Sequence, residues 1–231
     1  MSNGDLNIPL IVKELRSESA DCLSIVYERP PGFTFEAGMW MDIRFLSAEL
    51  SIGRTFSFAS SPTEPDLMIT FKQGATLFKA SMESVQPGDV MLITQYGSNG
   101  LRRDPTLPAV FLAGGVGIAP LRSMIKAGID EHAVLNTRLI YVNRTTDFPF
   151  RRELEEWRQI DPSLRLHLVV SGTEGHLTRQ QLAGYLAGSE ISHAKYYLAG
   201  PPGIVSSAES ILLRLHIAPD RILTDSFTGY E

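Results

Sequence analysis

The stretch FLAGGVGIAPLRSM, residues 111–124, puts three glycines and a proline between an apolar run and a segment with helical spacing. Glycine permits positive backbone angles and close approach of other atoms, and the free amides at the start of a helix attract anions. Two interpretations follow. The stretch is a strand, a phosphate-holding turn and a helix, or it is the same three parts packed tightly without a ligand. Its place between a strand and a helix favours the phosphate-holding turn.

From Leu107 onward, strand-like runs alternate with helix-like segments. The expected strands are PAVFLAG, TRLIYVN, LRLHLVV, KYYLAG and RILTD. The expected helices are PLRSMIKAGIDE, PFRRELEEWRQ, LTRQQLAGYL and PPGIVSSAESILLRLH, the first of them beginning near Pro120. This alternation predicts a five-stranded parallel sheet with helices on both faces. Ligands of such sheets bind at the carboxyl ends of the strands, where GGVG, NRTT, SGTEG and AGPPG fall.

From Pro9 to about Arg103 the pattern of apolar and turn residues is different. Short runs such as LIVKELRS, CLSIVYE, MWMDIRF, RTFSFAS and LMITFK are separated by turn residues such as PPG, EAG and QPGD. Six short strands at this spacing predict a closed antiparallel β-barrel. We place the boundary in the loop at 97–108, so that residues 1–104 form the barrel domain and residues 105–231 form the α/β domain.

The composition excludes several classes of function. The net charge of −5 argues against a nucleic-acid binder or an anionic-membrane binder, because both need a basic surface. The single cysteine, Cys22, leaves no internal disulfide and no iron-sulfur cluster, and we interpret it as a small buried hydrophobe. The N-terminus does not resemble a secretory signal and no window is apolar enough for a membrane span, so we expect a cytoplasmic protein.

The glycine turn departs from the standard dinucleotide fingerprint. The third glycine position holds Pro120, and the next strand ends in YVNRTT, with Asn143 and Arg144, instead of an acidic residue. An arginine at this tip suits a 2′-phosphate better than a free 2′-hydroxyl. The other interpretation of Arg144 is a solvated loop charge.

The stretch RTFSFASSP, residues 54–62, is a second candidate site. On a strand, Arg54, Phe56 and Phe58 share one face, while Thr55, Ser57 and Ala59 share the other. An arginine beside an aromatic residue can hold a phosphate and a flat ring together. A rim arginine with aromatic residues inside a barrel is the alternative.

Two further stretches are open to both structural and functional interpretations. AGPPG, residues 199–203, is a strand, a tight turn and a helix start. The ending DSFTGYE, residues 225–231, carries Phe227 and Tyr230 beside Asp225, which indicates either core packing or docking onto a flat group. The five histidines show no metal-ligand spacing, so no metal site is expected.

Taken together and in this order, these motifs resemble the ferredoxin-NADP reductase superfamily of flavoproteins, from about Leu10 to Tyr230. The resemblance implies that the barrel binds a flavin and that the α/β domain binds a nicotinamide nucleotide. In the family signature Arg-x-Tyr/Phe-Ser, Arg54 would contact the flavin phosphate, Phe56 would lie against the isoalloxazine ring and Ser57 would approach flavin N5. Thr55 belongs to the same signature.

The resemblance assigns roles to the remaining motifs as well. GATLFKASMESVQPGD resembles the block that binds the flavin pyrophosphate, which makes candidates of Lys72, Gly74, Ala75 and Thr76. AGGVGIAP would face the pyrophosphate of NAD(P)H with Gly114, Gly115 and Gly117, and Asn143 and Arg144 would lie near the adenosine ribose. In AGPPG, Gly200 and Pro201 would border the nicotinamide, while Ala199 replaces the cysteine of many members. Phe227 would border the flavin, and Asp225 would help to polarise the nicotinamide site.

The function implied is an NAD(P)H-dependent FAD oxidoreductase that moves a hydride between NADPH or NADH and bound FAD. Its electrons would pass to or from a separate carrier, such as a ferredoxin, a flavodoxin or an oxygenase component, since one cysteine cannot hold an iron-sulfur cluster. Ser57, Asp225 and Phe227 are the candidate catalytic residues. Two alternatives remain open: a flavin reductase that uses flavin as a substrate, and an electron-transfer subunit of a larger complex.

Overall fold

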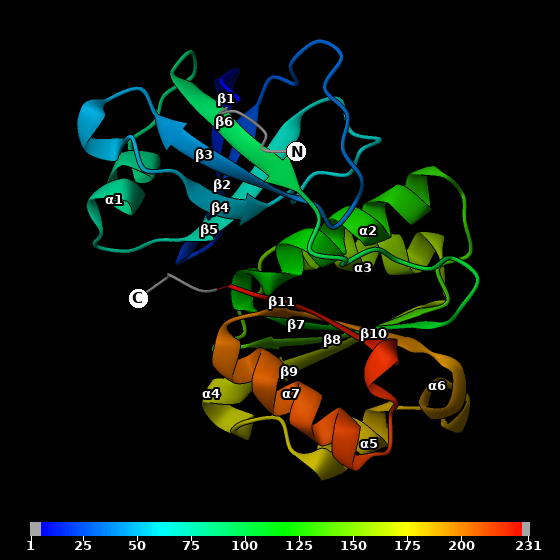
Figure 1. Ribbon diagram of the computed structural model, residues 1–231. Helices are drawn as coiled ribbons and strands as arrows, with labels where there is room; N and C mark the ends of the chain where they lie inside the picture. The colour runs from blue at the N-terminus through cyan, green and yellow to red at the C-terminus, as the bar shows by residue number, and fades with distance from the viewer. Residues whose placement is uncertain (1–5, 228–231) are drawn as a thin grey trace.

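A six-stranded antiparallel sheet forms the N-terminal half of the computed structural model, which describes residues 6–227 (Figure 1). The strand order is β4-β3-β6-β1-β2-β5. The backbone N–H of Ala59, after β4, donates to the carbonyl of Met68 in β5 at 2.7 Å, so the two ends of this order lie together and the sheet curls around its core. The strands are β1 (Ile8–Ser19), β2 (Cys22–Tyr27), β3 (Trp40–Phe45), β4 (Arg54–Ser57), β5 (Leu67–Lys72) and β6 (Val90–Gly97).

The core of this sheet follows from the two-residue alternation of its strands. Met41 and Ile43 of β3 are fully buried, and Phe56 of β4 pairs with Met41 on the same inner face. Helix α1 (Leu77–Glu83) closes one end of the core with Phe78 and Met82. The short 3₁₀ helix η1 (Ala48–Leu50) lies in the β3–β4 connection.

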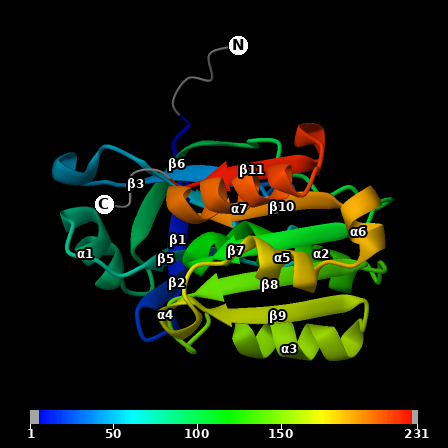
Figure 2. The ribbon, with the colours of Figure 1, turned by 90° about the horizontal axis from the view of Figure 1, so that it is seen from below.

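A five-stranded parallel sheet forms the C-terminal half, as predicted, in the order β11-β10-β7-β8-β9. Its strands are β7 (Ala109–Gly114), β8 (Thr137–Asn143), β9 (Leu164–Val170), β10 (Lys195–Gly200) and β11 (Ile222–Ser226). Its longer helices are α2 (Ile118–Asp130), α3 (Arg151–Ile160) and α7 (Pro202–Arg214), and the shorter ones are α4 (Ser171–Glu174), α5 (Arg179–Tyr185), α6 (Gly188–His193) and η3 (Pro219–Arg221). Figures 1 and 2 show α2 and α3 on the sheet face toward the barrel, and α5 and α7 on the opposite face.

The turn after β7 differs in detail from the sequence expectation. A 3₁₀ turn η2 (Gly115–Gly117) leads straight into α2 at Ile118, so the helix begins two residues before Pro120. A proline in the first helical turn costs little, because the amides there have no partner within the helix. Gly115 has a φ of +52°, and a Cβ at Gly117 would lie 2.1 Å from the carbonyl oxygen of Ala199. Glycine at 117 therefore allows η2 to pack directly against β10.

Residues 98–108 connect β6 to β7 and join the two halves. The buried side chain of Leu101 belongs to the core beneath α2, so this connection is packed and not a loose linker. The division into domains at residues 104 and 105 remains a proposal, and it falls within this connection. Within residues 6–227, no helix has both the length and the apolar character needed to cross a membrane.

Candidate functional site

A cavity of about 240 Å³ lies where the barrel meets the end of β11. Its polar groups come from both halves, since β4 and the β6–β7 connection belong to one and β11 to the other. The cavity therefore exists only when the two sheets are in contact. The lining residues are Trp40, Thr55, Ser57, Asn99, Asp225, Ser226 and Phe227.

A chain of hydrogen bonds crosses this cavity. The Ser57 hydroxyl donates to Oδ2 of Asp225 at 3.1 Å, and the Asn99 amide donates to Oδ1 of the same carboxylate at 3.4 Å. The Trp40 indole Nε1 donates to the Asn99 amide oxygen at 2.9 Å. These contacts fix the orientation of the Asp225 carboxylate and of the Ser57 hydroxyl.

Asp225 is 8% exposed, and within residues 6–227 its carboxylate takes part in no ion pair. Burial raises the pKa of this carboxyl group, and the hydrogen bonds from Ser57 and Asn99 only partly oppose the rise. A carboxyl group in this setting holds a proton more readily than an exposed aspartate. Such groups concentrate at functional sites.

Phe227 and Trp40 provide the aromatic surface of the cavity. The backbone N–H of Phe227 donates to the carbonyl of Gly200 at 3.0 Å, which ties the end of β11 to the end of β10. The structure thus brings together the three predicted catalytic residues, Ser57, Asp225 and Phe227. Tyr230, the second aromatic residue of the ending, lies outside the described residues.

Arg54 and Phe56 lie beside this cavity and do not line it. The guanidinium of Arg54 is exposed, donates to the carbonyl of Gly53 at 3.1 Å and lies 5.5 Å from the centre of the Phe78 ring. Phe56 is 4% exposed and its ring is nearly parallel to that of Phe78, at 6.4 Å. Because Phe56 and Ser57 point to opposite faces of β4, only Ser57 and Thr55 of the motif reach the cavity.

The predicted pyrophosphate residues of the barrel lie at the turn between β5 and α1. The backbone N–H of Gly74 donates to Glu83 Oε1 at 2.9 Å, and the Thr76 hydroxyl caps α1 by accepting from the backbone N–H of Lys79 at 3.3 Å. Gly74, Ala75 and Thr76 share this end of the barrel with Arg54, through the contact of Arg54 with Phe78 of α1.

Lys72 lies near the same turn but is directed toward the β1–β2 hairpin. Its ammonium group forms an ion pair with Asp21 at 3.0 Å, and both side chains are more than half exposed. A role for Lys72 in holding a phosphate would require this exposed pair to open, which costs little.

The glycine turn and the AGPPG stretch pack against each other. Gly200 has a φ of +144°, and a Cβ there would lie 2.9 Å from the carbonyl oxygen of Gly114. Gly115 in contrast faces open space, since no heavy atom of residues 6–227 outside its own local backbone and chain neighbours lies within 4 Å of where its Cβ would be. The ends of β7 and β10 are thus in contact with each other, and Pro201 begins the turn into α7. Since Phe227 bonds to Gly200, this glycine surface adjoins the cavity.

Asn143 and Arg144 lie at the end of β8, next to β7 in the sheet. The Asn143 amide donates to the carbonyl of Asp147 at 2.8 Å, and the carbonyl of Arg144 accepts from the backbone N–H of Gly172 at 3.0 Å. The Arg144 side chain is exposed and forms no ion pair with any residue from 6 to 227. Its guanidinium is therefore available to an anion at this edge of the sheet.

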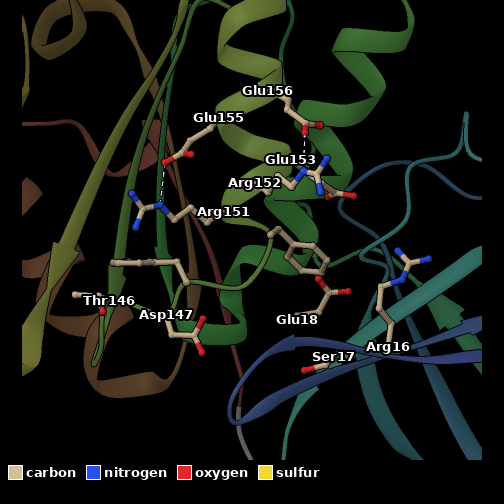
Figure 3. Close-up of a pocket in the computed structure, with 12 residues that line it drawn as sticks. Arg16, Ser17, Glu18, Thr146, Asp147, Arg151, Arg152, Glu153, Glu155 and Glu156 are labelled. Carbon is tan, nitrogen blue, oxygen red and sulfur yellow. Dashed lines mark hydrogen bonds and ion pairs between the residues drawn. The ribbon is translucent and has the colours of Figure 1, made fainter.

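A larger cavity, of about 790 Å³, lies elsewhere, between β1 and the segment at 146–156 (Figure 3). Two of its arginines are already paired: Arg151 with Glu155 at 2.8 Å and Arg152 with Glu156 at 2.9 Å. None of the predicted site residues lines it. Among residues 6–227, no group of three or more His, Cys, Asp or Glu side chains is arranged to hold a metal ion.

Three residues of the smaller cavity, Trp40, Asn99 and Ser226, were not predicted as site residues from the sequence. Trp40 falls in the strand-like run MWMDIRF and Asn99 in the expected domain boundary, and neither position carries a motif. The available signals are weak. Tryptophan occurs only twice in the chain, and the asparagine in GSNG is a polar group at a domain junction.

Comparison with known protein families matches residues 111–210 to a model described as the oxidoreductase NAD-binding domain. Among curated proteins, the chain is 24% identical to flavohemoprotein A of Dictyostelium discoideum over 94% of its own length and 59% of that protein. It is 28% identical to the reductase component of propane 2-monooxygenase from Rhodococcus jostii over 87% of its length and 57% of that protein. The chain therefore spans less than three fifths of the length of these two relatives.

A solved structure shares the whole architecture. The ferredoxin NADP+ reductase of Neisseria gonorrhoeae, crystallised with FAD and NADP, superposes with a TM-score of 0.82 at 17% identity. The match covers 94% of this chain and 97% of that one. At this identity the likeness establishes the fold, with the barrel and the parallel sheet in the same arrangement.

Proposed function

Because the chain belongs to the ferredoxin-NADP reductase superfamily, we propose that it is an NAD(P)H-dependent flavoprotein oxidoreductase. The observation that carries this proposal is the hydrogen bond between Ser57 and Asp225. It unites the last residue of the flavin motif with a buried carboxyl group of the nucleotide-binding half. Hydride transfer requires two bound partners at a shared boundary, and this pair lies at that boundary.

The groups around the smaller cavity fit the ring system of FAD. Trp40 and Phe227 supply flat apolar surfaces, the Asn99 amide supplies a hydrogen-bond donor, and the Ser57 hydroxyl oxygen, whose proton is donated to Asp225, supplies an acceptor. When bound, FAD accepts a hydride and releases its electrons to an acceptor. We assign FAD binding to Arg54, Thr55, Phe56, Ser57, Lys72, Gly74, Ala75, Thr76 and Phe227.

The support for Arg54 as a phosphate ligand is its exposed guanidinium at the end of β4, close to the β5–α1 turn. Phe56 packs against the ring of Phe78, and we assign it an indirect role at the flavin site. In this proposal Phe56 acts by setting the position of Phe78 and Arg54. The aromatic surface toward the flavin ring is then provided by Trp40 and Phe227.

We assign the nicotinamide nucleotide to the carboxyl edge of the parallel sheet. Gly114, Gly115 and Gly117 would receive the pyrophosphate, and the open space at Gly115 supports this. Gly200 and Pro201 would border the nicotinamide, beside Phe227. Asn143 and Arg144 would lie near the adenosine ribose. The guanidinium of Arg144, which pairs with no carboxylate of residues 6–227, favours NADPH over NADH.

Ser57 and Asp225 act in this proposal by orienting each other at the cavity wall. The Asp225 carboxylate holds the Ser57 hydroxyl in one rotamer at the cavity wall. Burial raises the pKa of the Asp225 carboxyl group, so it takes up a proton more readily than an exposed aspartate does. No strong base is required, because the redox chemistry belongs to the cofactors.

We further propose that a separate carrier protein exchanges electrons with the flavin. Support comes from the relatives, one of which is the reductase component of a monooxygenase system, and from the single cysteine of this chain. A ferredoxin, a flavodoxin or an oxygenase component would serve. A cytoplasmic location is part of the proposal, since such carriers and NADPH occur there, and cell fractionation tests it.

The experiment is an absorbance spectrum of the purified protein, followed by anaerobic addition of NADPH or NADH. A yellow protein with about one FAD per chain, reduced by either nucleotide and able to reduce an added ferredoxin or an artificial acceptor, supports the proposal. A colourless protein that oxidises NADPH only with free flavin identifies a flavin reductase instead. Bound FAD that neither nucleotide reduces contradicts the proposal and favours a subunit of a larger complex.

A further inference from the structure

Arg122 has an unusual position for an arginine. It lies in α2, four residues after the start of the helix at Ile118, and it is 2% exposed. A buried guanidinium is costly unless its donors are all paired. Here Nε, Nη1 and Nη2 each donate at least one hydrogen bond, so the group is stabilised by its partners.

Two of these partners belong to the barrel half. Nη1 of Arg122 donates to the carbonyl of Ala59 at 2.8 Å and to Glu64 Oε2 at 2.9 Å, and Nη2 donates to Glu64 Oε1 at 3.1 Å. The neighbouring Ser123 hydroxyl donates to the carbonyl of Ser60 at 2.7 Å. Helix α2 is thus bonded to the segment that directly follows β4.

The remaining partners belong to the C-terminal half. Nε and Nη2 of Arg122 donate to the two carboxylate oxygens of Glu153 in α3, at 2.7 and 3.0 Å. The guanidinium also lies 5.1 Å from the ring centre of Phe150 and 5.3 Å from that of Trp157. Figure 3 shows Glu153 at the α3 side of the larger cavity, facing the barrel strands. Arg122 therefore binds one carboxylate from each half with paired hydrogen bonds.

This connection joins the two parts of the proposed site. At its N-terminal end, α2 continues from η2, the turn assigned to the nicotinamide nucleotide. Ala59 and Ser60, which accept the bonds from α2, lie two and three residues after Ser57. The nucleotide turn is therefore connected to the Ser57 hydroxyl through the first turn of α2, the Arg122 guanidinium and the short segment that follows β4.

We propose that Arg122 is a positioning residue for hydride transfer, which sets the distance between the nucleotide turn of α2 and the flavin-facing end of β4. The inference rests on the proposed function. A planar guanidinium that is bidentate to Glu64 and to Glu153 fixes both separation and orientation, which an ammonium cannot do. An error of about 1 Å in the placement of reacting groups can slow a reaction by about 100-fold.

The chain offers a matched control in Arg138. This arginine of β8 is also buried and also binds a glutamate, Glu190, because its Nε donates to both carboxylate oxygens at 2.8 and 2.9 Å. Its partner lies in α6, so the pair links two elements of the same half. Arg138→Lys therefore removes a comparable buried contact without acting on the junction with the barrel.

The test compares Arg122→Lys and Arg138→Lys with the wild-type protein, all as FAD-loaded full chains. The measurements are the rate of flavin reduction at saturating NADPH, the Kd of NADPH, the FAD content and the Tm. Both variants are expected to lose thermal stability. Only Arg122→Lys should slow reduction, by about tenfold or more, with unchanged Kd and FAD content. When the nicotinamide nucleotide is bound to Arg122→Lys, the long-wavelength absorbance band of the complex should be weaker than in the wild type. That band depends on the stacking of the nicotinamide ring on the flavin ring.

Ser123→Ala is the milder companion variant, used in the same way if Arg122→Lys does not fold. It removes only the bond to the carbonyl of Ser60 and should slow reduction by a few fold. If NADPH or NADH reduces the wild-type flavin and the flavin of Arg122→Lys or Ser123→Ala is reduced equally fast, this inference alone is overturned. It is also overturned if Arg138→Lys slows flavin reduction as much as Arg122→Lys does. A wild-type protein that binds FAD but is reduced by neither nucleotide overturns the proposed function together with this inference.

Discussion

The Ser57 hydroxyl in β4 lies 3.1 Å from Asp225 Oδ2 in β11, although 168 residues separate them in the chain. One residue belongs to the antiparallel sheet and the other to the parallel sheet. The contact is buried on both sides, with each residue 8% exposed. Any change in the relative position of the two sheets therefore acts directly on this pair.

Loss of the Ser57 hydroxyl should slow hydride transfer. A hydrogen bond to a charged group contributes about 1.5 to 3 kcal/mol, and the rate falls about tenfold for each 1.4 kcal/mol of lost transition-state stabilisation. For Ser57→Ala we expect a reduction rate about 10 to 100 times lower with NADPH, measured in a stopped-flow instrument, with FAD content unchanged. Ser206→Ala, an exposed serine of α7, is the control and should match the wild-type rate. If Ser57→Ala is reduced by NADPH as fast as the wild type, Ser57 has no role in hydride transfer.

Arg144 should determine the preference between NADPH and NADH. If its guanidinium pairs with the 2′-phosphate, Arg144→Ala raises the KM for NADPH by about 10 to 100 times and leaves the KM for NADH unchanged. Arg152→Ala is the control, because the Arg152 side chain is 93% exposed and pairs with Glu156 of its own helix. The steady-state ratio of kcat/KM for the two nucleotides is the measurement. An unaltered ratio would assign Arg144 to the solvated surface.

The features that the sequence predicted well are those set by neighbouring residues. The β7 strand, its glycine turn and α2 follow from local periodicity and from the backbone freedom of Gly115. The family resemblance assigned Ser57 to the flavin and Asp225 to the nicotinamide site, but their contact was not predicted, because spacing along the chain carries no information about a contact between two sheets.

The missed features depend on tertiary packing. The packing of Phe56 opposite Met41 on the inner face of the barrel is an example, since only the register of β3 with β4 determines it. In the sequence, nothing distinguishes Arg122 from an exposed arginine on a helix surface. Its burial depends on Glu64 and Glu153, which lie 58 and 31 residues away.

Glu18 in β1 should oppose folding at neutral pH. Its Oε1 atom is buried without a hydrogen-bond partner among residues 6–227. Burial raises the pKa of the carboxyl group, helped by the charge of Glu153 and only partly opposed by the Ser24 hydroxyl and by nearby arginines. A carboxyl group whose pKa is higher in the folded state favours folding when protonated, so its cost is present above the raised pKa and disappears below the ordinary value of 4.5. Glu18→Gln should therefore increase the free energy of unfolding at pH 7 by on the order of 1 kcal/mol.

Chemical denaturation at pH 7 and near pH 4 measures this effect. The gain should be present at pH 7 and absent near pH 4, where Glu18 is largely protonated in both states. Glu14→Gln on the same strand is the control, since Glu14 is exposed and pairs with Arg16 at 3.0 Å. The control should be neutral or slightly destabilising. A Glu18→Gln variant no more stable than the wild type at pH 7 would contradict the prediction.

His167 in β9 should make the protein less stable in mild acid. Arginine can only donate, so the contact of Arg138 Nη1 with His167 Nε2 at 2.7 Å requires a neutral imidazole with its proton on Nδ1. Burial, and then the charge of Arg138, lower the pKa of this histidine below 6.5. Since the unfolded chain takes up a proton first, the free energy of unfolding should fall as the pH drops below 6.5 and level off below the folded-state pKa.

His167→Gln should keep an acceptor for Arg138 and flatten this dependence between pH 7 and pH 5, measured by thermal unfolding. A glutamine does not titrate, so the unfolded chain loses its advantage in binding a proton at this position. His193→Gln is the control, because His193 is exposed and contacts a backbone carbonyl of its own helix. A wild-type curve that is flat over this range would contradict the prediction, because the folded and unfolded chains would then take up protons equally.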